Sequence, residues 1–335
     1  MWYDCTCRDG KECRHHKYHY YFNTLNLICH NPKLQRIKIE HLMVETPGSP
    51  LFDNNILRSL SKLQYLRCLE ITASFNLEQW LQVLGHLPAS LEELDIFTWD
   101  EFSDIRPLQV TAQTNLRRLA IQYNNLEHIV PLLKQSPLLE DVTFYCGDQD
   151  LSEFITALTS HCPRIHSICL NNLEETLVDL TSIMPQIFDT YRKLRALGLY
   201  SGSSYFDQIQ PSMAPLHYSA NTLVSLRLDF LASGADAGII LRTFPNLRVF
   251  VLGLLFVCEG ESGVSLHDLL YERKNGSQPA SPAEAQHIPW ACRNLEEFKC
   301  DITSSSGPNN APPEEERAWT ARQVGQLYQE LRILR

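Results

Sequence analysis

The chain has 335 residues, of which 44% are hydrophobic and 20% are charged. This balance is typical of a folded protein with a sizeable core and excludes a disordered or collagen-like chain. The 29 Lys and Arg are outnumbered by 39 Asp and Glu, which gives a formal net charge of −10. Such a surface repels a phosphate backbone, so we expect no nucleic-acid partner.

No segment of the sequence has the composition of a membrane span or a targeting signal. The longest uninterrupted apolar run covers residues 249–258, far short of the roughly 20 residues that cross a bilayer. The first residues, Met1-Trp2-Tyr3-Asp4, do not start a basic signal or transit peptide. The 11 Cys are scattered along the chain, which favours reduced, buried thiols over a disulfide framework. We therefore expect a cytoplasmic or nuclear protein with no membrane partner.

A repeated apolar pattern organises the chain. Ten copies of apolar-x-x-apolar-x-apolar occur, and their first members are 23 to 32 residues apart except for a gap of 48 before the tenth. The copies are Leu34/Ile37/Ile39, Leu66/Leu69/Ile71, Leu91/Leu94/Ile96, Leu116/Leu119/Ile121, Leu139/Val142/Phe144, Ile165/Ile168/Leu170, Leu194/Leu197/Leu199, Leu223/Leu226/Leu228, Leu247/Phe250/Leu252 and Leu295/Phe298/Cys300. Because the last two members of each copy are two residues apart, they share one face of a short strand.

Segments with helical spacing lie between the predicted strands. Leu151, Phe154, Ile155 and Leu158 follow the i, i+3, i+4, i+7 pattern, with Asp150 as the expected N-cap. A helix that joins two parallel strands makes a right-handed connection, and no single unit can bury its apolar face alone. The sequence therefore predicts a right-handed α/β solenoid with a curved parallel sheet on its concave side and helices on its convex side.

The pattern resembles the leucine-rich-repeat family. The units at residues 161–170 and 290–298 are similar to the repeat half of fungal F-box/leucine-rich-repeat proteins, and the resemblance covers about residues 18–335. The asparagine expected three residues after the third apolar position occurs in a single unit, as Asn124, so we expect an irregular stack. An F-box would precede the repeats, where the sequence offers only residues 1–17. The resemblance thus implies a substrate-binding solenoid without a recognisable F-box.

The predicted domain organisation is simple. Residues 1–17 form an irregular leader, and residues 18–335 form a single solenoid of about ten units, with mobile insertions near 259–289 and 304–318. A helical stripe through Val324, Leu327 and Tyr328 follows the second insertion. Leu331 and Leu334 then begin an eleventh unit at the end of the sequence. One interpretation of these ends is a truncated leucine-rich-repeat fragment without independent function.

The leader contains the one cluster of potential metal ligands in the sequence. Thiolate and imidazole groups suit zinc, although the interval between the first two cysteines is tighter than in usual zinc sites. The cluster consists of Cys5, Cys7, Cys13, His15, His16 and His19. No nucleophile elbow, phosphate-binding loop or metalloprotease motif occurs in the sequence, so we expect no enzyme activity and no cofactor.

Residues between the apolar strand positions are expected on the concave wall, because strand side chains alternate between faces. Aromatic residues and Arg on a rigid wall are the types enriched at protein interfaces. The predicted partner-binding residues are Glu93, Asp95, Phe97, Arg118, Gln122, Asp141, Tyr145, Tyr200, Arg227 and Asp229. The carboxylates among them favour a protein or peptide partner with a basic segment.

The sequence therefore predicts a non-catalytic protein–protein interaction scaffold. Its most specific form is the substrate-recognition arm of an SCF-type ubiquitin ligase, which would bind the ligase adaptor only if an F-box is supplied elsewhere. The alternatives are a zinc-stapled regulatory protein that uses the N-terminal Cys/His cluster, and the truncated fragment described above.

Overall fold

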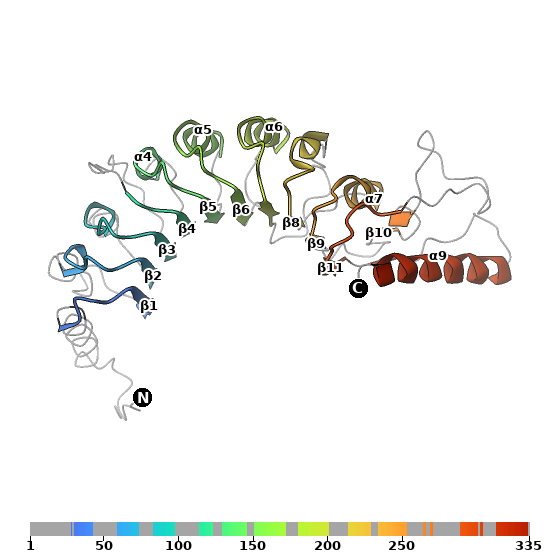
Figure 1. The fold of residues 1–335 in the computed structure, drawn as a ribbon, viewed down its shortest axis with the longest axis horizontal. Coiled ribbons are helices and arrows are strands. Elements are labelled where there is room, and N and C mark those ends of the chain that lie inside the picture. Colours follow the sequence, from blue (N-terminus) through green and yellow to red (C-terminus); the bar gives the residue numbers. More distant parts are fainter. Residues whose placement is uncertain are drawn as a thin grey trace, which may run out of the picture. The chain divides into compact units, whose positions relative to one another are not determined.

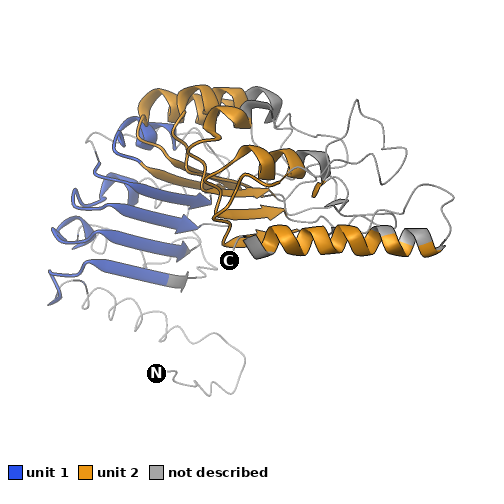
Figure 2. Cartoon of the chain, turned by 45° about the vertical axis from the view of Figure 1, so that its right-hand side comes forward, with its two compact units in different colours: residues 1–139 blue, residues 140–335 orange. Residues whose placement is uncertain are grey.

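The computed structural model describes residues 28, 30–42, 59–73, 83–97, 114–122, 129–145, 151–171, 180–200, 214–228, 234–252, 264–265, 269–270, 289–300, 302–303 and 313–333. The chain forms two compact units, residues 1–139 and 140–335 (Figure 2). The sequence predicts a single solenoid over residues 18–335, and this stays a prediction.

The protein is an α/β protein with a ten-stranded sheet whose strands follow one another in chain order (Figure 1). Unit 1 contributes the parallel strands β1 (Arg36–Leu42), β2 (Cys68–Ala73), β3 (Glu93–Phe97) and β4 (Arg118–Gln122). Unit 2 contributes the parallel strands β5 (Asp141–Tyr145), β6 (Ser167–Asn171), β7 (Ala196–Leu199), β8 (Ser225–Leu228), β9 (Val249–Leu252) and β11 (Glu297–Lys299). Each of the ten predicted apolar triads lies at one of these strands, which confirms the α/β class and the parallel sheet.

The core follows from the register of the triads. In unit 1 Ile37 pairs with Leu69, which pairs with Leu94, which pairs with Leu119. Equivalent apolar residues are therefore stacked from strand to strand, and these four are 0 to 7% exposed. Burial alternates along β3, β5 and β6, as expected for strands with one covered face.

Helices cover the apolar face of the strands in unit 2 (Figure 1). They are α5 (Ser152–His161), α6 (Leu180–Thr190), the 3₁₀ helix η3 (Ala214–Ser219) and α7 (Gly234–Thr243), and unit 1 contains α4 (Val130–Lys134). Helix α5 buries Phe154, Ile155 and Leu158, as its spacing predicts. Its N-cap residue is Leu151, which makes no side-chain capping bond, so the expected cap was misplaced by one residue. Asp150 itself lies outside the described residues.

Polar side chains connect successive repeats at the position immediately before the apolar triad. Ser90, Asn115, Thr222 and Asn246 each stand immediately before the first apolar residue of a triad. The Ser90 hydroxyl donates to the Leu66 carbonyl at 2.8 Å, and the Thr222 hydroxyl donates to the Leu194 carbonyl at 2.8 Å. The side-chain amides of Asn115 and Asn246 each donate to a carbonyl of the preceding turn at 2.7 Å. These bonds satisfy backbone acceptors at the turns, where the strand ladder does not reach them.

The structure describes parts of the C-terminal segments in which the sequence predicts mobile insertions. Val264–Ser265 (β10) pairs in parallel with Ile302–Thr303 (β12), and Leu269 and Leu270 are buried, so the 259–289 segment is anchored at these points. Helix α9 (Pro313–Ile333) begins inside the segment near 304–318 for which the sequence predicts a mobile insertion, and it also contains Leu331. Leu331 therefore belongs to a helix and does not begin an eleventh strand unit. None of the helices among the described residues has the length and apolar character needed to cross a membrane.

Candidate partner-binding faces

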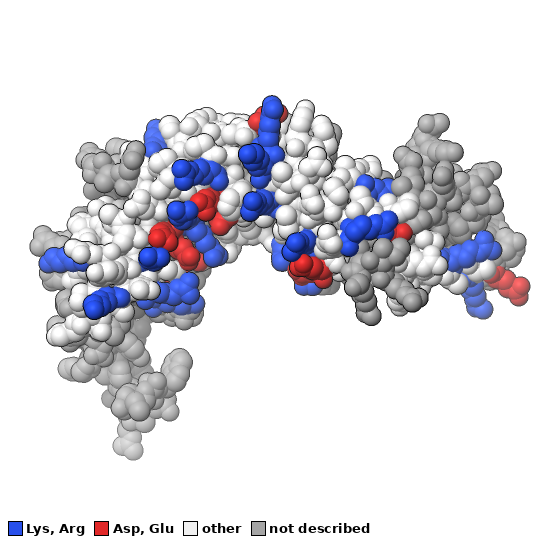
Figure 3. Space-filling view, viewed as in Figure 1, with Lys and Arg blue, Asp and Glu red and all other residues white. Residues whose placement is uncertain are grey.

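The strand positions that alternate with the apolar core form aligned rows on unit 1. Arg36, Cys68, Glu93 and Arg118 are register partners across β1 to β4. Lys38, Glu70, Asp95 and Ala120 form the next row. We call these two rows the unit 1 face. Basic and acidic side chains are interleaved on it, and Figure 3 shows the resulting mixture of charges on this part of the surface.

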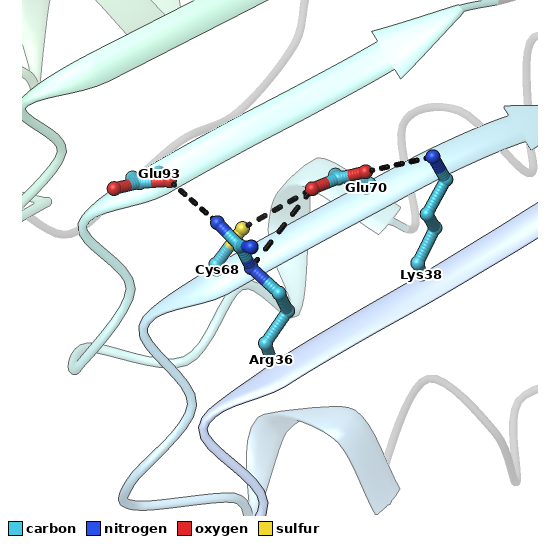
Figure 4. Close-up of polar contacts among 5 residues, drawn as sticks. All are labelled: Arg36, Lys38, Cys68, Glu70 and Glu93. Carbon is cyan, nitrogen blue, oxygen red and sulfur yellow. Dashed lines mark hydrogen bonds and ion pairs between the residues drawn. The ribbon is translucent and has the colours of Figure 1, made fainter.

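Ion pairs inside the sheet balance most of the carboxylates on the unit 1 face (Figure 4). The Arg36 guanidinium lies 3.5 Å from the Glu93 carboxylate and 3.9 Å from that of Glu70. The Lys38 ammonium lies 3.4 Å from Glu70. Exposed pairs of this kind contribute little to stability. These ion pairs have a larger effect on partner recognition, because a carboxylate such as that of Glu93 is already neutralised by a residue of its own sheet.

Asp95 differs from the other carboxylates of this face. It is half-buried, and its Oδ1 atom is buried without a hydrogen-bond partner. Burial and the neighbouring Glu70 carboxylate raise the pKa of Asp95, while Arg118 and Lys38 oppose the rise. The ionised form of Asp95 is therefore less well solvated here than in water. A cationic group of a partner would find an incompletely satisfied carboxylate at this position.

The substitution Asp95→Asn should stabilise unit 1 at neutral pH by a few tenths to about 1 kcal/mol. Because the pKa of Asp95 in the folded protein is raised above the ordinary value of an aspartate, protonated Asp95 contributes stability that is fully present below that ordinary value. This stability is lost as the pH rises through the folded pKa. The variant should therefore gain over wild type at pH 7 and match it at about pH 3 in urea unfolding. The control Glu93→Gln removes the ion pair with Arg36 and should give no gain, and an equal gain would contradict the assignment to Asp95.

Among the open strand positions of unit 2, an aromatic side chain lies close to a glycine. A Cβ atom at Gly198 would lie 2.9 Å from Cε2 of Tyr200 and 3.1 Å from Sγ of Cys169. The absence of a side chain at Gly198 therefore lets the Tyr200 ring lie close against the strands. Tyr145 and Asn171 are register partners on β5 and β6, near the same ends of the strands. We call these residues, together with Arg227 and its partners, the unit 2 face.

The charged groups of the unit 2 face are also paired within the sheet. The Arg227 guanidinium lies 3.2 Å from the Glu297 carboxylate, and the Lys299 ammonium lies 2.6 Å from it. The hydrogen bond from Lys299 lowers the pKa of Glu297, so this carboxylate stays ionised. Asp141 lies 3.3 Å from Nδ1 of His166, which gives Asp141 a neighbour that is charged only when protonated.

The structure distributes the predicted partner-binding residues over the two units. Unit 1 holds Glu93, Asp95, Phe97, Arg118 and Gln122, and these lie on adjacent strands. Unit 2 holds Asp141, Tyr145, Tyr200 and Arg227. Asp229 lies outside the described residues. All six candidate zinc ligands, from Cys5 to His19, also lie outside them, and the described part of the chain contains no cluster of three potential metal ligands.

Buried thiols account for several of the cysteines. Cys68, Cys162 and Cys292 are free and buried. Burial raises the pKa of Cys162 to about 12 and that of Cys292 to about 11, so both remain protonated near neutral pH. A protonated, buried thiol is a poor nucleophile and a poor metal ligand. Cys162 and Cys292 act as small apolar groups, as the sequence predicts, whereas the Cys68 thiol on the unit 1 face donates to the Glu70 carboxylate at 3.8 Å.

Sequence reasoning missed five charged residues that take part in the ion pairs of the two faces. The predicted face began at the third triad, although the same alternation places Arg36 and Lys38 on β1 and Glu70 on β2. It likewise ended before Glu297 and Lys299 on β11. Extending the strand alternation to the first and last triads would have identified all five.

No family model and no curated protein sequence matches this chain.

Proposed function

We propose that this chain is a leucine-rich-repeat protein and that it acts as a non-catalytic scaffold. In this proposal its strands and helices form a right-handed, curved solenoid, and the open strand positions form the concave side. A protein or peptide partner binds there. The most specific form of the proposal is the substrate-recognition arm of an SCF-type ubiquitin ligase in the cytoplasm or nucleus, with its F-box supplied elsewhere.

One observation carries the proposal: strands β3, β5, β6, β8 and β9 bury one face in the core and leave alternate positions half-buried, and on β7 the alternate position Gly198 is buried but has no side chain. On unit 2 these positions combine the aromatic residues Tyr145 and Tyr200 with Gly198, Arg227 and Cys169. Aromatic and Arg side chains next to small residues are the composition of protein-binding surfaces. Parallel strands are usually covered on both faces, so a face that is left open calls for another occupant.

The charges favour a particular kind of partner segment. Because Arg36 and Lys38 already neutralise Glu93 and Glu70, the unit 1 face does not attract cations over its whole area. Asp95 remains the carboxylate with an unsatisfied, buried oxygen atom. A segment with one Lys or Arg at this point, flanked by polar residues, fits the face better than a uniformly basic segment. Such pairing contributes mainly to selectivity and association rate.

The experiment is affinity capture with the wild-type chain and with Asp95→Arg, Asp141→Arg and Tyr200→Ala. The charge reversals place a cation where the proposal places a partner's cation, and the Tyr200 variant removes an aromatic anchor. We expect each variant to lose bound partners by at least about tenfold, since an interface anchor contributes about 2 kcal/mol or more. Co-capture of adaptor or cullin subunits would support the ligase form.

The matched control is Glu153→Arg, which makes the same change of charge on an exposed position of helix α5. This variant should retain the wild-type partners. Identical partner lists from all four variants would reject the strand faces as the binding surface. Circular dichroism and a melting curve for each variant separate lost binding from lost folding.

A further inference from the structure

A pocket of about 250 Å³ lies outside the open strand faces, within unit 1. Successive turns that lead into strands build its wall. Its lining residues are Gln64, Tyr65, Arg67, Ser90, Glu92, Asn115, Arg117 and Leu138. The side chains of Asn115 and Ser90 make hydrogen bonds that connect successive repeats, and these bonds fix the spacing of the pocket wall.

Two guanidinium groups, those of Arg67 and Arg117, and the Glu92 carboxylate line this pocket together. Arg67, Glu92 and Arg117 each occupy the residue immediately before a strand, on β2, β3 and β4 in turn. Their backbones are held in order, because the Glu92 N–H donates to the Arg67 carbonyl at 2.8 Å and the Arg117 N–H donates to the Glu92 carbonyl at 2.7 Å. Neighbouring strands are about 4.8 Å apart, so the Glu92 backbone lies between those of two basic residues. Arg67, Glu92 and Arg117 together carry a formal excess of one positive charge, in a chain whose net charge is −10.

The existing ion pair leaves room for a competing anion. Nη1 of Arg67 lies 3.8 Å from Oε1 of Glu92, and the two side chains are 67% and 40% exposed. A charge-assisted hydrogen bond to a carboxylate is normally about 2.7–2.9 Å long. A ligand oxyanion could approach both guanidiniums more closely than Glu92 approaches Arg67, with Glu92 turning toward solvent.

The pocket also offers apolar surface for a small ligand body. The Tyr65 side chain is 55% exposed, and Leu138 also lines the wall. A volume of about 250 Å³ is below the range of about 300–1,000 Å³ that holds drug-sized ligands or cofactors. The space suits a group the size of one amino-acid side chain.

We propose that this pocket binds an oxyanion carried on a small aromatic or aliphatic body, held between Arg67 and Arg117 with its carbon atoms against Tyr65. A carboxylate or a phosphate monoester at the end or on a side chain of a peptide has this chemistry. The pocket does not include the open strand faces, so the test of this proposal is independent of the test of the scaffold function.

The test uses the full chain and ligand-observed saturation-transfer NMR at low ionic strength, with phenyl phosphate, benzoate and neutral benzyl alcohol as probes. We expect at least one anion to bind and benzyl alcohol not to bind. Binding of phenyl phosphate alone identifies a phosphorylated group, and binding of benzoate alone identifies a carboxylate. Arg67→Gln and Arg117→Gln should each weaken binding by about tenfold or more, as expected for loss of one charged hydrogen bond.

Two further variants keep the test decisive if an Arg variant folds poorly. Glu92→Gln removes the competing carboxylate and should strengthen anion binding severalfold, the opposite direction to damage. Arg118→Gln changes the next residue in the chain, which lies on the unit 1 face, and should alter binding less than twofold. Any one of four results would overturn the proposal. They are an equal loss of binding in Arg118→Gln, no gain of binding in Glu92→Gln, equal binding of benzyl alcohol, and no anion binding at millimolar concentration.

Discussion

The substitution Phe144→Ala should lower the free energy of unfolding of unit 2 by about 3–5 kcal/mol. Phe144 is the third apolar residue of its triad on β5 and is 1% exposed, and Phe154 on α5 is fully buried. Their ring centroids are 4.6 Å apart with an interplanar angle of 25°, so the pair connects the helix to the preceding strand. Removing one ring leaves a cavity that the surrounding core cannot fill. Urea unfolding followed by circular dichroism measures the loss.

Two controls test the physical reason for this loss. Tyr145→Ala removes the next aromatic residue, which lies on the other side of the strand and is partly exposed, and should cost at most about 1 kcal/mol. A double-mutant cycle of Phe144→Ala with Phe154→Ala should show about 0.5–1.5 kcal/mol of coupling beyond the separate losses. Equal costs at positions 144 and 145 would contradict the alternation of faces on which the candidate partner-binding surfaces depend.

The strands could be predicted from the sequence because their signal is local. A spacing of two between apolar residues, as in Leu94 and Ile96, selects one face of a strand regardless of its neighbours. The register also follows, since equivalent residues of successive triads bury each other, as Leu69 and Leu94 do. Local periodicity therefore yielded the fold class and the positions of the strands.

The buried face of the C-terminal helix could not be predicted from apolar spacing. The stripe through Val324 and Tyr328 correctly indicates a helix, but these side chains are 38% and 68% exposed. The buried residues of α9 include Gln323 and Glu330, which are 0% and 2% exposed. Glu330 is buried because it accepts a hydrogen bond from the Trp290 backbone N–H at 3.3 Å. That bond joins residues 40 apart in the chain, and no periodicity encodes it.

The charge pairs of the candidate faces are likewise long-range. Arg36 reaches Glu93 across an intervening strand, and Arg227 reaches Glu297 across β9. A list of exposed residues shows their types but not which carboxylates are already neutralised. The sequence therefore predicted the membership of the faces better than their electrostatics, and Asp95 could be distinguished from Glu93 only with coordinates.

A second large effect is expected at Trp290, which connects β11, α9 and the 269–270 segment. Its indole N–H donates to the Leu269 carbonyl at 3.3 Å, and its ring meets the Phe298 ring edge-on at 5.6 Å. The side chain is fully buried. Trp290→Ala should therefore remove about 3–5 kcal/mol from the local stability of this end of unit 2.

Hydrogen exchange should show that this loss is confined to the C-terminal end. Strands that follow one another in chain order contact mainly their neighbours, so β11 and α9 should lose protection while β5 to β7 keep it. Trp290→Phe keeps most of the ring and removes the indole N–H, but Arg242 also donates to the Leu269 carbonyl at 3.2 Å, so this variant should cost only about 0.5–1.5 kcal/mol. Tyr328→Ala, at an exposed position of α9, should change protection little. Uniform loss of protection across unit 2 in Trp290→Ala would show that the unit unfolds as one body and that its end is not an independent layer.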